Sequence, residues 1–342
     1  MNVALQNSQV ISVSAHDDRS EPGFERLARL TSFLEGRLGE WDHLPSLVRV
    51  QLLGGKRLRA RLLFAAAPPG DPEQSQAMVR AAAAVELVHA GSLLHDDIVD
   101  QASRRRGHCA AYRLYGERFA TRAGTFVMEE ATVLFAGLPL DARLAFARAA
   151  RAASLGQLAE IAHTGNLELG LRERLQIMDG KTAVIFQLAA RLGAMLGGAG
   201  SNVVRTSAAV GRWFGFLFQL ADDVEDLCAS PEALGRPPGS DLRSGVVTLP
   251  VVFLVEARGA AAFGSAQSLA WRAEELLAAR DLRALFRDAG AFARARVLGI
   301  RWADRIEKML EDLPDGPGRC WILNLTKQVE RVLLERLEVA DD

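Results

Sequence analysis

One stretch of the chain joins a helix-forming run to a cluster of acids, and it restricts the fold more than any other. Small and apolar residues dominate 81–95, and three carboxylates follow: Asp96, Asp97 and Asp100. On a helix, residues four apart leave the same face, so Asp96 and Asp100 lie one turn apart. Asp97 is turned by about 100° and can reach the same opening. Such like charges destabilise a helix unless a cation neutralises them.

These acids and the basic residues after them suit a metal and phosphate site. Clustered carboxylates bind hard cations, and Mg²⁺ usually takes one or two of them together with waters and phosphates. Arg104, Arg105 and Arg106 follow directly, and guanidinium groups bind phosphate oxygens through paired hydrogen bonds. Taken alone, the stretch is explained almost as well by a solvated acidic helix end and a basic loop.

The rest of the chain favours helix almost throughout. Alanine, leucine and arginine abound, tyrosine and β-branched residues are sparse, and no alternating strand pattern of useful length occurs. Gly180 lies inside a helical pattern, where glycine often marks a kink, and 230–247 is a long Pro/Gly-rich loop. Breaks at glycine and proline predict helices over 23–39, 45–54, 56–67, 71–100, 110–136, 141–163, 171–196 and 202–226, and more helices beyond 248, separated at 264, 290 and 314–318.

The composition and the absence of a linker in the sequence indicate one soluble domain. No Pro/Ser-rich linker divides the chain, so we expect a single all-α domain over 21–342 behind a disordered leader at 1–20. The net charge of −1 gives no reason to expect a nucleic-acid partner. Three scattered cysteines suggest a reducing compartment. The N-terminus lacks a secretory pattern and charges interrupt the apolar runs, so a cytoplasmic, non-transmembrane protein is expected.

A second acidic cluster repeats the spacing of the first. Asp222, Asp223 and Asp226 again stand at the C-terminal end of a long apolar helix that leads into an arginine-bearing loop. Two facing clusters can hold several Mg²⁺ ions and clamp a diphosphate, neutralising its charge as it departs. The neighbouring Glu225 is expected to be solvated.

Six motifs now stand in a recognisable order, and together they resemble the trans-isoprenyl diphosphate synthases (polyprenyl synthetases) over roughly 45–335. The motifs are Gly54-Gly55-Lys56-Arg57-Leu58-Arg59, Leu94-His95-Asp96-Asp97-Ile98-Val99-Asp100, Arg105-Arg106-Gly107, Gly180-Lys181-Thr182-Ala183, Phe218-Gln219 with the second acidic cluster, and Asp241-Leu242 followed by Thr248-Leu249-Pro250.

The resemblance implies a helical bundle around a deep central cavity, usually a homodimer, that condenses isopentenyl diphosphate head-to-tail with an allylic diphosphate. It implies direct Mg²⁺ ligation by Asp96, Asp100 and Asp222, with help from Asp97, Asp223 and Asp226. It implies that the allylic diphosphate is held by Arg105 and Lys181, and that Thr182 and Gln219 line the reacting centre. For the diphosphate of isopentenyl diphosphate, the implied ligands are Lys56, Arg59, His89 and Arg106.

The sequence departs from the family pattern at three positions. Val246 and Arg236 stand where lysines are usual, and Thr125 stands where an aspartate is usual. These departures leave open a non-catalytic or weakly active partner subunit. A class I terpene cyclase is a third reading, although Lys56 and Arg59 argue for two diphosphates and hence for condensation.

Two small residues just before the first acidic cluster bear on product length. Gly91 and Ser92 stand where short-chain family members often carry bulky aromatics. If the growing chain passes along this helix, small side chains leave room for it. The expected product therefore has twenty carbons or more, and a farnesyl product is the less favoured alternative.

Overall fold

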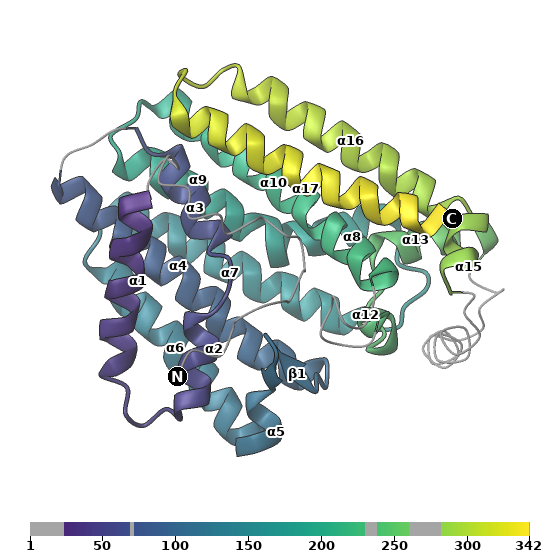
Figure 1. Cartoon of the computed structure of the whole chain (residues 1–342), viewed down its shortest axis with the longest axis horizontal. Coiled ribbons are helices and arrows are strands. Elements are labelled where there is room, and N and C mark those ends of the chain that lie inside the picture. The colour runs from purple at the N-terminus through teal and green to yellow at the C-terminus, as the bar shows by residue number, and fades with distance from the viewer. Residues whose placement is uncertain (1–23, 69–71, 230–237, 260–281, 342) are drawn as a thin grey trace.

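The computed structural model describes residues 24–68, 72–229, 238–259 and 282–341 (Figure 1). The predicted leader, Arg236 and the predicted break at Gly264 lie outside these residues. The N-terminal helices are α1 (Phe24–Gly39), α2 (Ser46–Leu53), α3 (Leu58–Ala66), α4 (Pro72–Val99), α5 (Ala111–Tyr115), α6 (Glu117–Ala136) and α7 (Leu140–Ala162). Those that follow are α8 (Leu171–Met178), α9 (Val184–Leu196), α10 (Ser201–Cys228), α12 (Ser240–Arg243), α13 (Leu249–Arg258), α15 (Leu282–Asp288), α16 (Ala291–Leu310) and α17 (Pro317–Asp341).

The all-α prediction is confirmed, with three local differences. The helix predicted over 110–136 is divided at Gly116, where φ is 85°, into α5 and α6. The predicted loop after the first acidic cluster contains a hairpin of β1 (Arg104–Arg105) and β2 (His108–Cys109). Its two-residue turn, Arg106-Gly107, has positive φ at both positions (51° and 78°), the conformation that suits tight hairpins. Within the predicted loop 230–247, the described part forms the short helix α12.

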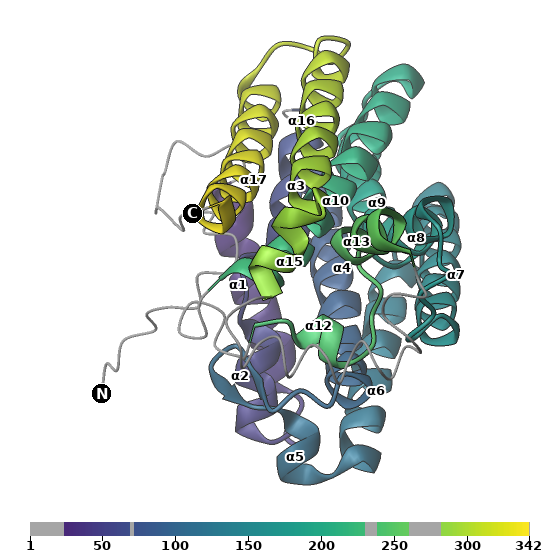
Figure 2. The ribbon, with the colours of Figure 1, turned by 90° about the vertical axis from the view of Figure 1, so that its right-hand side faces the viewer.

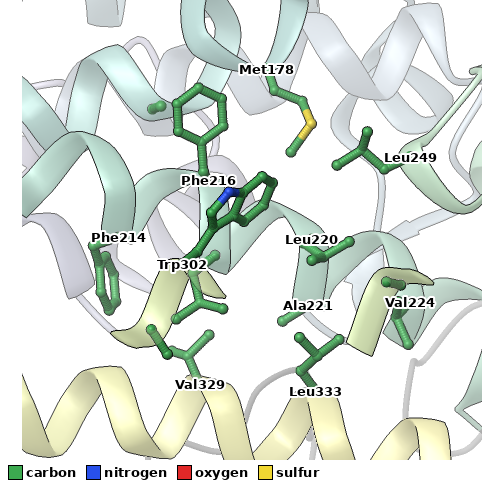
Figure 3. Packing of buried hydrophobic residues seen from close by; sticks show 14 of the residues in the cluster. Met178, Phe214, Phe216, Leu220, Ala221, Val224, Leu249, Trp302, Val329 and Leu333 are labelled. Carbon is green, nitrogen blue, oxygen red and sulfur yellow. The ribbon is translucent and has the colours of Figure 1, made fainter. Parts of the chain in front are cut away.

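Two apolar cores are joined by α3 and α9. One core lies among α8, α10, α13 and the C-terminal helices, and the other among α1, α2, α4, α6 and α7. In α9, Phe186 belongs to the first core and Leu188 to the second. In α3, Leu62 belongs to the first core and Leu63 to the second. Figure 3 shows the first core, where Phe214 and Phe216 of α10 lie near Trp302 of α16. Both phenylalanines are buried.

Helix α4 runs through the interior, which explains its composition. Within the described residues, one helical segment, Ser75–Val99, is long and apolar enough to cross a membrane, and 67% of its most apolar window is buried. The alanine run 81–84 is 0% exposed, so this segment has the burial of a core helix. Its small side chains let neighbouring helices pack closely against it.

The closest approach to α4 comes from α6, and it corrects the expectation that Gly91 leaves open space. A Cβ at Gly91 would lie 2.9 Å from the carbonyl oxygen of Gly124 and 2.9 Å from the Met128 side chain. His95, one turn further along α4, covers Gly124 in turn and is hydrogen-bonded through Nε2 to the Thr121 carbonyl at 2.9 Å. A side chain at position 91 would therefore push the two helices apart.

A second close approach gives a test of the packing. A Cβ at Gly193 in α9 would lie 1.9 Å from the carbonyl oxygen of Leu63 in α3. We expect Gly193→Ala to lower the free energy of unfolding by about 1–3 kcal/mol, the usual cost of overpacking. Gly36→Ala is the matched control, because Gly36 lies inside α1 with nothing near its Cβ position. It should stabilise the protein by about 0.5–1 kcal/mol. Urea unfolding measures both, and equal effects would contradict the packing described.

Candidate functional site

A π-helical turn, Asp179–Ala183, connects α8 to α9 and carries two predicted site residues. The kink predicted at Gly180 is thus confirmed as an extra residue in the helix, a feature often found at functional sites. The turn packs closely on α7, where a Cβ at Gly156 would lie 2.4 Å from the Lys181 backbone nitrogen. The Thr182 hydroxyl donates a hydrogen bond to Gln219 Oε1 on α10 at 2.7 Å.

Lys181 is held by Glu160, a residue of α7 that sequence reasoning missed. Glu160 is 9% exposed and accepts hydrogen bonds from Lys181 Nζ and, at 3.0 Å, from Arg174 Nη1. Burial acts to lower the pKa of Lys181, but Glu160 and Asp96 outweigh it and raise the pKa. Burial acts to raise the pKa of Glu160, but Lys181 and Arg174 outweigh it and lower the pKa of this carboxyl. Lys181 is therefore a fixed, fully charged ammonium.

The same network extends to the second acidic cluster through Asp223. Gln219 Nε2 donates to Asp223 Oδ1 at 2.7 Å, and the Leu249 N–H donates to Oδ2 at 3.3 Å. Arg174 lies 3.6 Å from the same Oδ2. Burial raises the pKa of Asp223 to about 6 in spite of Arg174. The chain Thr182–Gln219–Asp223 therefore joins the π-helical turn, α10 and the start of α13.

The first acidic cluster lies at the end of α4, against the hairpin. Asp97 is 1% exposed, and Arg105 Nε donates to its Oδ1 at 2.6 Å. Burial raises the pKa of Asp96, and it raises the pKa of Asp100 to about 6, although Lys181 and Arg105 oppose the shift. Lys181 thus acts electrostatically on both Asp96 and Asp100.

Asp241 of α12 acts electrostatically on acids of both clusters. It raises the pKa of Asp100, just beyond the end of α4, and of Asp223 on α10, and Figure 2 shows α12 near the end of α4. Asp226 holds α12 in place, because its Oδ2 accepts the Asp241 N–H at 3.1 Å and its carbonyl accepts the Gly239 N–H at 2.7 Å. The structure therefore gives Asp226 a backbone-capping contact, and its role at a metal stays a prediction.

No single ion site is preformed by these acids. Among the described residues, no three His, Cys, Asp or Glu side chains lie close enough to hold one metal ion. The donors are carboxylates, which suit Mg²⁺, an ion that commonly binds through one or two of them and through phosphate oxygens. The acids therefore fit ions that a bound diphosphate completes.

The predicted basic residues form a second group beside the acids. Arg106 Nη1 donates to the carbonyls of Gln51 and Gly54, at 2.5 Å each. Its guanidinium lies directly over Gly55, where φ is +104° and a Cβ would lie 2.6 Å from Nη2. The Gly54-Gly55 pair is thus required both by the backbone conformation and by the arginine above it.

Burial lowers the pKa of four basic residues in this group, Lys56, Arg59, His89 and Arg106. The pKa of Lys56 falls to about 8, and that of Arg59 to about 10, although Asp222 opposes both shifts. Burial and the surrounding arginines hold the pKa of His89 well below its usual value, so this imidazole is neutral at pH 7. Within the described part of the chain, Arg59 Nε is buried and makes no hydrogen bond, and its guanidinium stacks 4.6 Å from the Phe186 ring centroid. Arg59 therefore has a donor left for an anion.

Glu86 is the buried carboxylate around which this basic group is arranged, and reasoning from the sequence assigned it no role. It is 4% exposed on α4, and its Oε1 accepts the N–H of Ala60 in the first turn of α3 at 3.0 Å. Arg57 Nη1 lies 3.5 Å from its Oε2, while Nη2 donates to the carbonyl of Leu53 at 2.5 Å. Glu86 also acts electrostatically on Arg59 and Arg106. It thereby ties α4 to the turn that presents Lys56 and Arg59.

The expectation that Glu225 is solvated is wrong. Glu225 is 1% exposed and accepts a hydrogen bond at 3.0 Å from Arg336 Nη2, near the C-terminal end of α17. It also raises the pKa of Lys56, against the effect of burial. Because Arg336 follows Glu225 by 111 residues in sequence, no local sequence pattern predicts this ion pair.

Two of the three departures from the family pattern lie in the described residues. Thr125 is exposed on α6, and its hydroxyl donates to the Thr121 carbonyl within the same helix at 3.0 Å. Val246 is half-buried, and its N–H donates to the Asp241 carbonyl at 2.8 Å. Neither side chain adds a charge to the site. A cavity lined by Asp97 and Arg106 has a volume of about 10 Å³, and the deep central cavity stays a prediction.

Comparisons with known proteins agree on one family. Residues 43–272, more than half of the chain, match the polyprenyl synthetase family. A nonaprenyl diphosphate synthase of Mycobacterium tuberculosis is 30% identical over 295 residues, 86% of this chain and 88% of that protein. A geranylgeranyl diphosphate synthase of Methanosarcina mazei is 32% identical over 281 residues, 80% of this chain and 84% of that protein.

Solved structures agree as well. A polyprenyl synthase of Caulobacter crescentus, complexed with calcium and isoprenyl diphosphate, superposes with a TM-score of 0.82 at 29% identity over 90% of this chain and 95% of that one. The helical fold, the two acidic clusters with their basic neighbours, and these relatives lead to one conclusion: the chain belongs to the polyprenyl synthetase family and is a prenyltransferase.

Proposed function

We propose that this protein is a Mg²⁺-dependent synthase that joins isopentenyl diphosphate head-to-tail to an allylic diphosphate. The observation that carries the proposal is the separation of two cationic groups around the acids. Lys181 and Arg105 interact with Asp96, Asp97 and Asp100. Lys56 and Arg59 interact with Asp222. Two sets of fixed cations suit two diphosphates, whereas a cyclase binds only one.

In this proposal the allylic diphosphate lies between the acidic clusters and is held by Lys181 and Arg105. Asp96, Asp100 and Asp222, assisted by Asp97, Asp223 and Asp226, would hold Mg²⁺, which would supply positive charge to neutralise the departing diphosphate. Lys181 is already oriented by Glu160, so its charge is in place before the carbon–oxygen bond breaks. Preorganised charge of this kind lowers the barrier to ionisation.

Thr182 and Gln219 are proposed to face the allylic cation. Their oxygens and the Asp223 carboxylate form one hydrogen-bonded chain, and such fixed dipoles stabilise developing positive charge without rearranging. Isopentenyl diphosphate is held by Lys56, Arg59, His89 and Arg106, and its double bond attacks the cation. Arg236, which lies outside the described residues, is proposed to bind substrate as well. A proton is then lost, with the departing diphosphate as the proposed base.

An assay with defined substrates tests the function. Purified protein is incubated with Mg²⁺, isopentenyl diphosphate and, separately, dimethylallyl, geranyl or farnesyl diphosphate, and products are analysed by mass spectrometry. Elongated diphosphates are the expected result. Hydrocarbons or alcohols would indicate a cyclase, and no turnover would indicate a partner subunit. The partner-subunit alternative is supported by the similarity to a protein named heptaprenyl diphosphate synthase component 2.

A homodimer is proposed on the basis of an apolar stripe along α7. Leu144, Leu155, Leu158 and Ile161 are between 44% and 61% exposed and lie on one side of this helix. A second copy of the chain would bury them. Light scattering should give twice the chain mass, and Leu158→Glu should reduce it. A cytoplasmic location is part of the same proposal.

Glu86 allows a test of the second-substrate group. We expect Glu86→Ala to raise the KM for isopentenyl diphosphate by about 10–100-fold, because a charged hydrogen bond of about 1.5–3 kcal/mol positions the turn that carries Lys56 and Arg59. The KM for the allylic diphosphate should change little. Glu86→Gln is the matched control, since its amide oxygen can still accept the Ala60 N–H. Equal increases in both KM values would contradict this role.

The pKa of Asp100 predicts how metal affinity depends on pH. A carboxyl with a pKa of about 6 must lose its proton before it can bind Mg²⁺, so affinity should fall by about tenfold per pH unit below pH 6. It should be nearly constant above pH 7. Titration calorimetry with Mg²⁺ and a non-reactive diphosphate measures the profile. Asp100→Asn should weaken binding and make the profile less steep without flattening it, because the pKa of Asp223 is also raised to about 6. A wild-type affinity that does not change between pH 5 and 7 would refute the assignment.

Product length is proposed to be twenty carbons or more. Because Gly91 packs against α6, Ser92 is the better position for a test; it is half-buried, and its hydroxyl donates to the His89 carbonyl at 2.9 Å. Ser92→Phe should shorten the products, as read by mass spectrometry. Leu114→Phe on α5, where the leucine is 53% exposed, is the control that should leave them unchanged. Identical products from Ser92→Phe would rule out this position as the limit.

A further inference from the structure

A groove on the outer surface, away from the acidic clusters, is lined by α8, α10 and α16. Its volume is about 550 Å³, within the range of small-molecule sites. Trp213, Phe216 and Trp302 form its floor, with ring centroids 5.5–6.3 Å apart. Leu171, Leu175 and Leu298 complete the apolar lining. Nothing in the proposed condensation uses this space.

The rim of the groove carries arginines. Arg172 is exposed on α8. Arg212 lies 5.6 Å from the Phe216 ring centroid, and Arg305 lies 4.5 Å from the Trp213 ring centroid. An apolar floor needs an apolar ligand body, and guanidinium groups at the edge favour an anionic end.

One rim arginine is joined to the π-helical turn. Arg212 donates two hydrogen bonds to Asp179, from Nε at 2.6 Å and from Nη2 at 2.8 Å. Asp179 is the first residue of the turn that carries Lys181 and Thr182. The remaining nitrogen of Arg212, Nη1, points to no acceptor among the described residues and is left for a ligand.

We propose that this groove binds an amphipathic anion, a phosphorylated chain of isoprenoid type, with its hydrocarbon on the three aromatic rings and its phosphate between Arg172 and Arg212. The choice of an isoprenoid chain rests on the proposed function; the apolar body and anionic end follow from the groove itself. The phosphate competes with Asp179 for Arg212, so occupancy of the groove acts on the turn that holds Lys181.

Titration calorimetry with farnesyl monophosphate, dodecyl phosphate and farnesol tests the site. The experiment uses the full chain carrying Asp96→Asn and Asp222→Asn, in the presence of EDTA, so that metal-dependent binding at the acidic clusters does not contribute. We expect saturable binding of the phosphates and binding of farnesol at least about tenfold weaker, since a charged hydrogen bond is worth about 1.5–3 kcal/mol. Preference for farnesyl over dodecyl phosphate supports an isoprenoid ligand, whereas preference for dodecyl phosphate overturns it.

Variants locate the binding. Arg172→Glu should weaken both phosphates about tenfold or more and leave farnesol unchanged, and Leu175→Glu should weaken all three ligands. Asp179→Asn should tighten phosphate binding, because it removes the competing carboxylate. Leu114→Glu, an exposed leucine on α5 outside the groove, should change nothing.

Binding that neither groove variant weakens, or no saturable phosphate binding, would overturn the proposal. Thermal unfolding of Arg172→Glu, an exposed position, confirms that the variant is folded. The result is independent of the synthase assay: groove binding without condensation would refute the proposed activity alone, and condensation without groove binding would refute this site alone.

Discussion

The site depends on keeping charged side chains out of water beside their counterions. Asp97 with Arg105, Glu160 with Lys181 and Arg174, and Glu225 with Arg336 all place a carboxylate that is less than a tenth exposed against a cation. Burying such pairs costs several kcal/mol of desolvation per ion, and apolar residues of similar size would often serve stability as well or better. Their concentration around the acidic ends of α4 and α10 is therefore better explained by binding of a charged ligand than by folding.

Close helix packing makes this charge arrangement possible. Glycines at 91 and 124 bring α4 and α6 together, and Gly156 lets the π-helical turn rest on α7. With α7 this close, Glu160 reaches both Lys181 and Arg174. A regular α-helix through Asp179–Ala183 would rotate Lys181 and Thr182 relative to α7 and α10, because each residue turns the helix by about 100°. The extra residue of the turn thus sets the direction of two site side chains at once.

Local patterns in the sequence predict the helices and the two acidic clusters well, because each depends on spacing within a few residues. The repeated Asp-Asp-x-x-Asp motif and the kink at Gly180 are of this kind. Glu86, Glu160 and Glu225 escape such reasoning, since their partners lie 14 to 111 residues away in the sequence. A buried carboxylate and a solvated one look alike on a helix whose neighbours are unknown, which is why the sequence predicts a solvated Glu225. Gly91 shows the opposite case: a small residue predicts open space, and a neighbouring backbone fills it.

The departures from the family pattern at Val246 and Thr125 differ in how they affect the charges around the acids. Thr125 is exposed and bonds within its own helix, so its hydroxyl takes no part in the contacts around the acids. Val246 removes one cation near α12, where Asp241 already adds negative charge to Asp100 and Asp223. A missing lysine there leaves these acids more dependent on Lys181, and on the proposed Mg²⁺, for neutralisation. In the proposed mechanism the loss therefore falls on the affinity for metal and diphosphate, while the hydrogen-bonded chain from Thr182 to Asp223, which is proposed to face the allylic cation, stays intact.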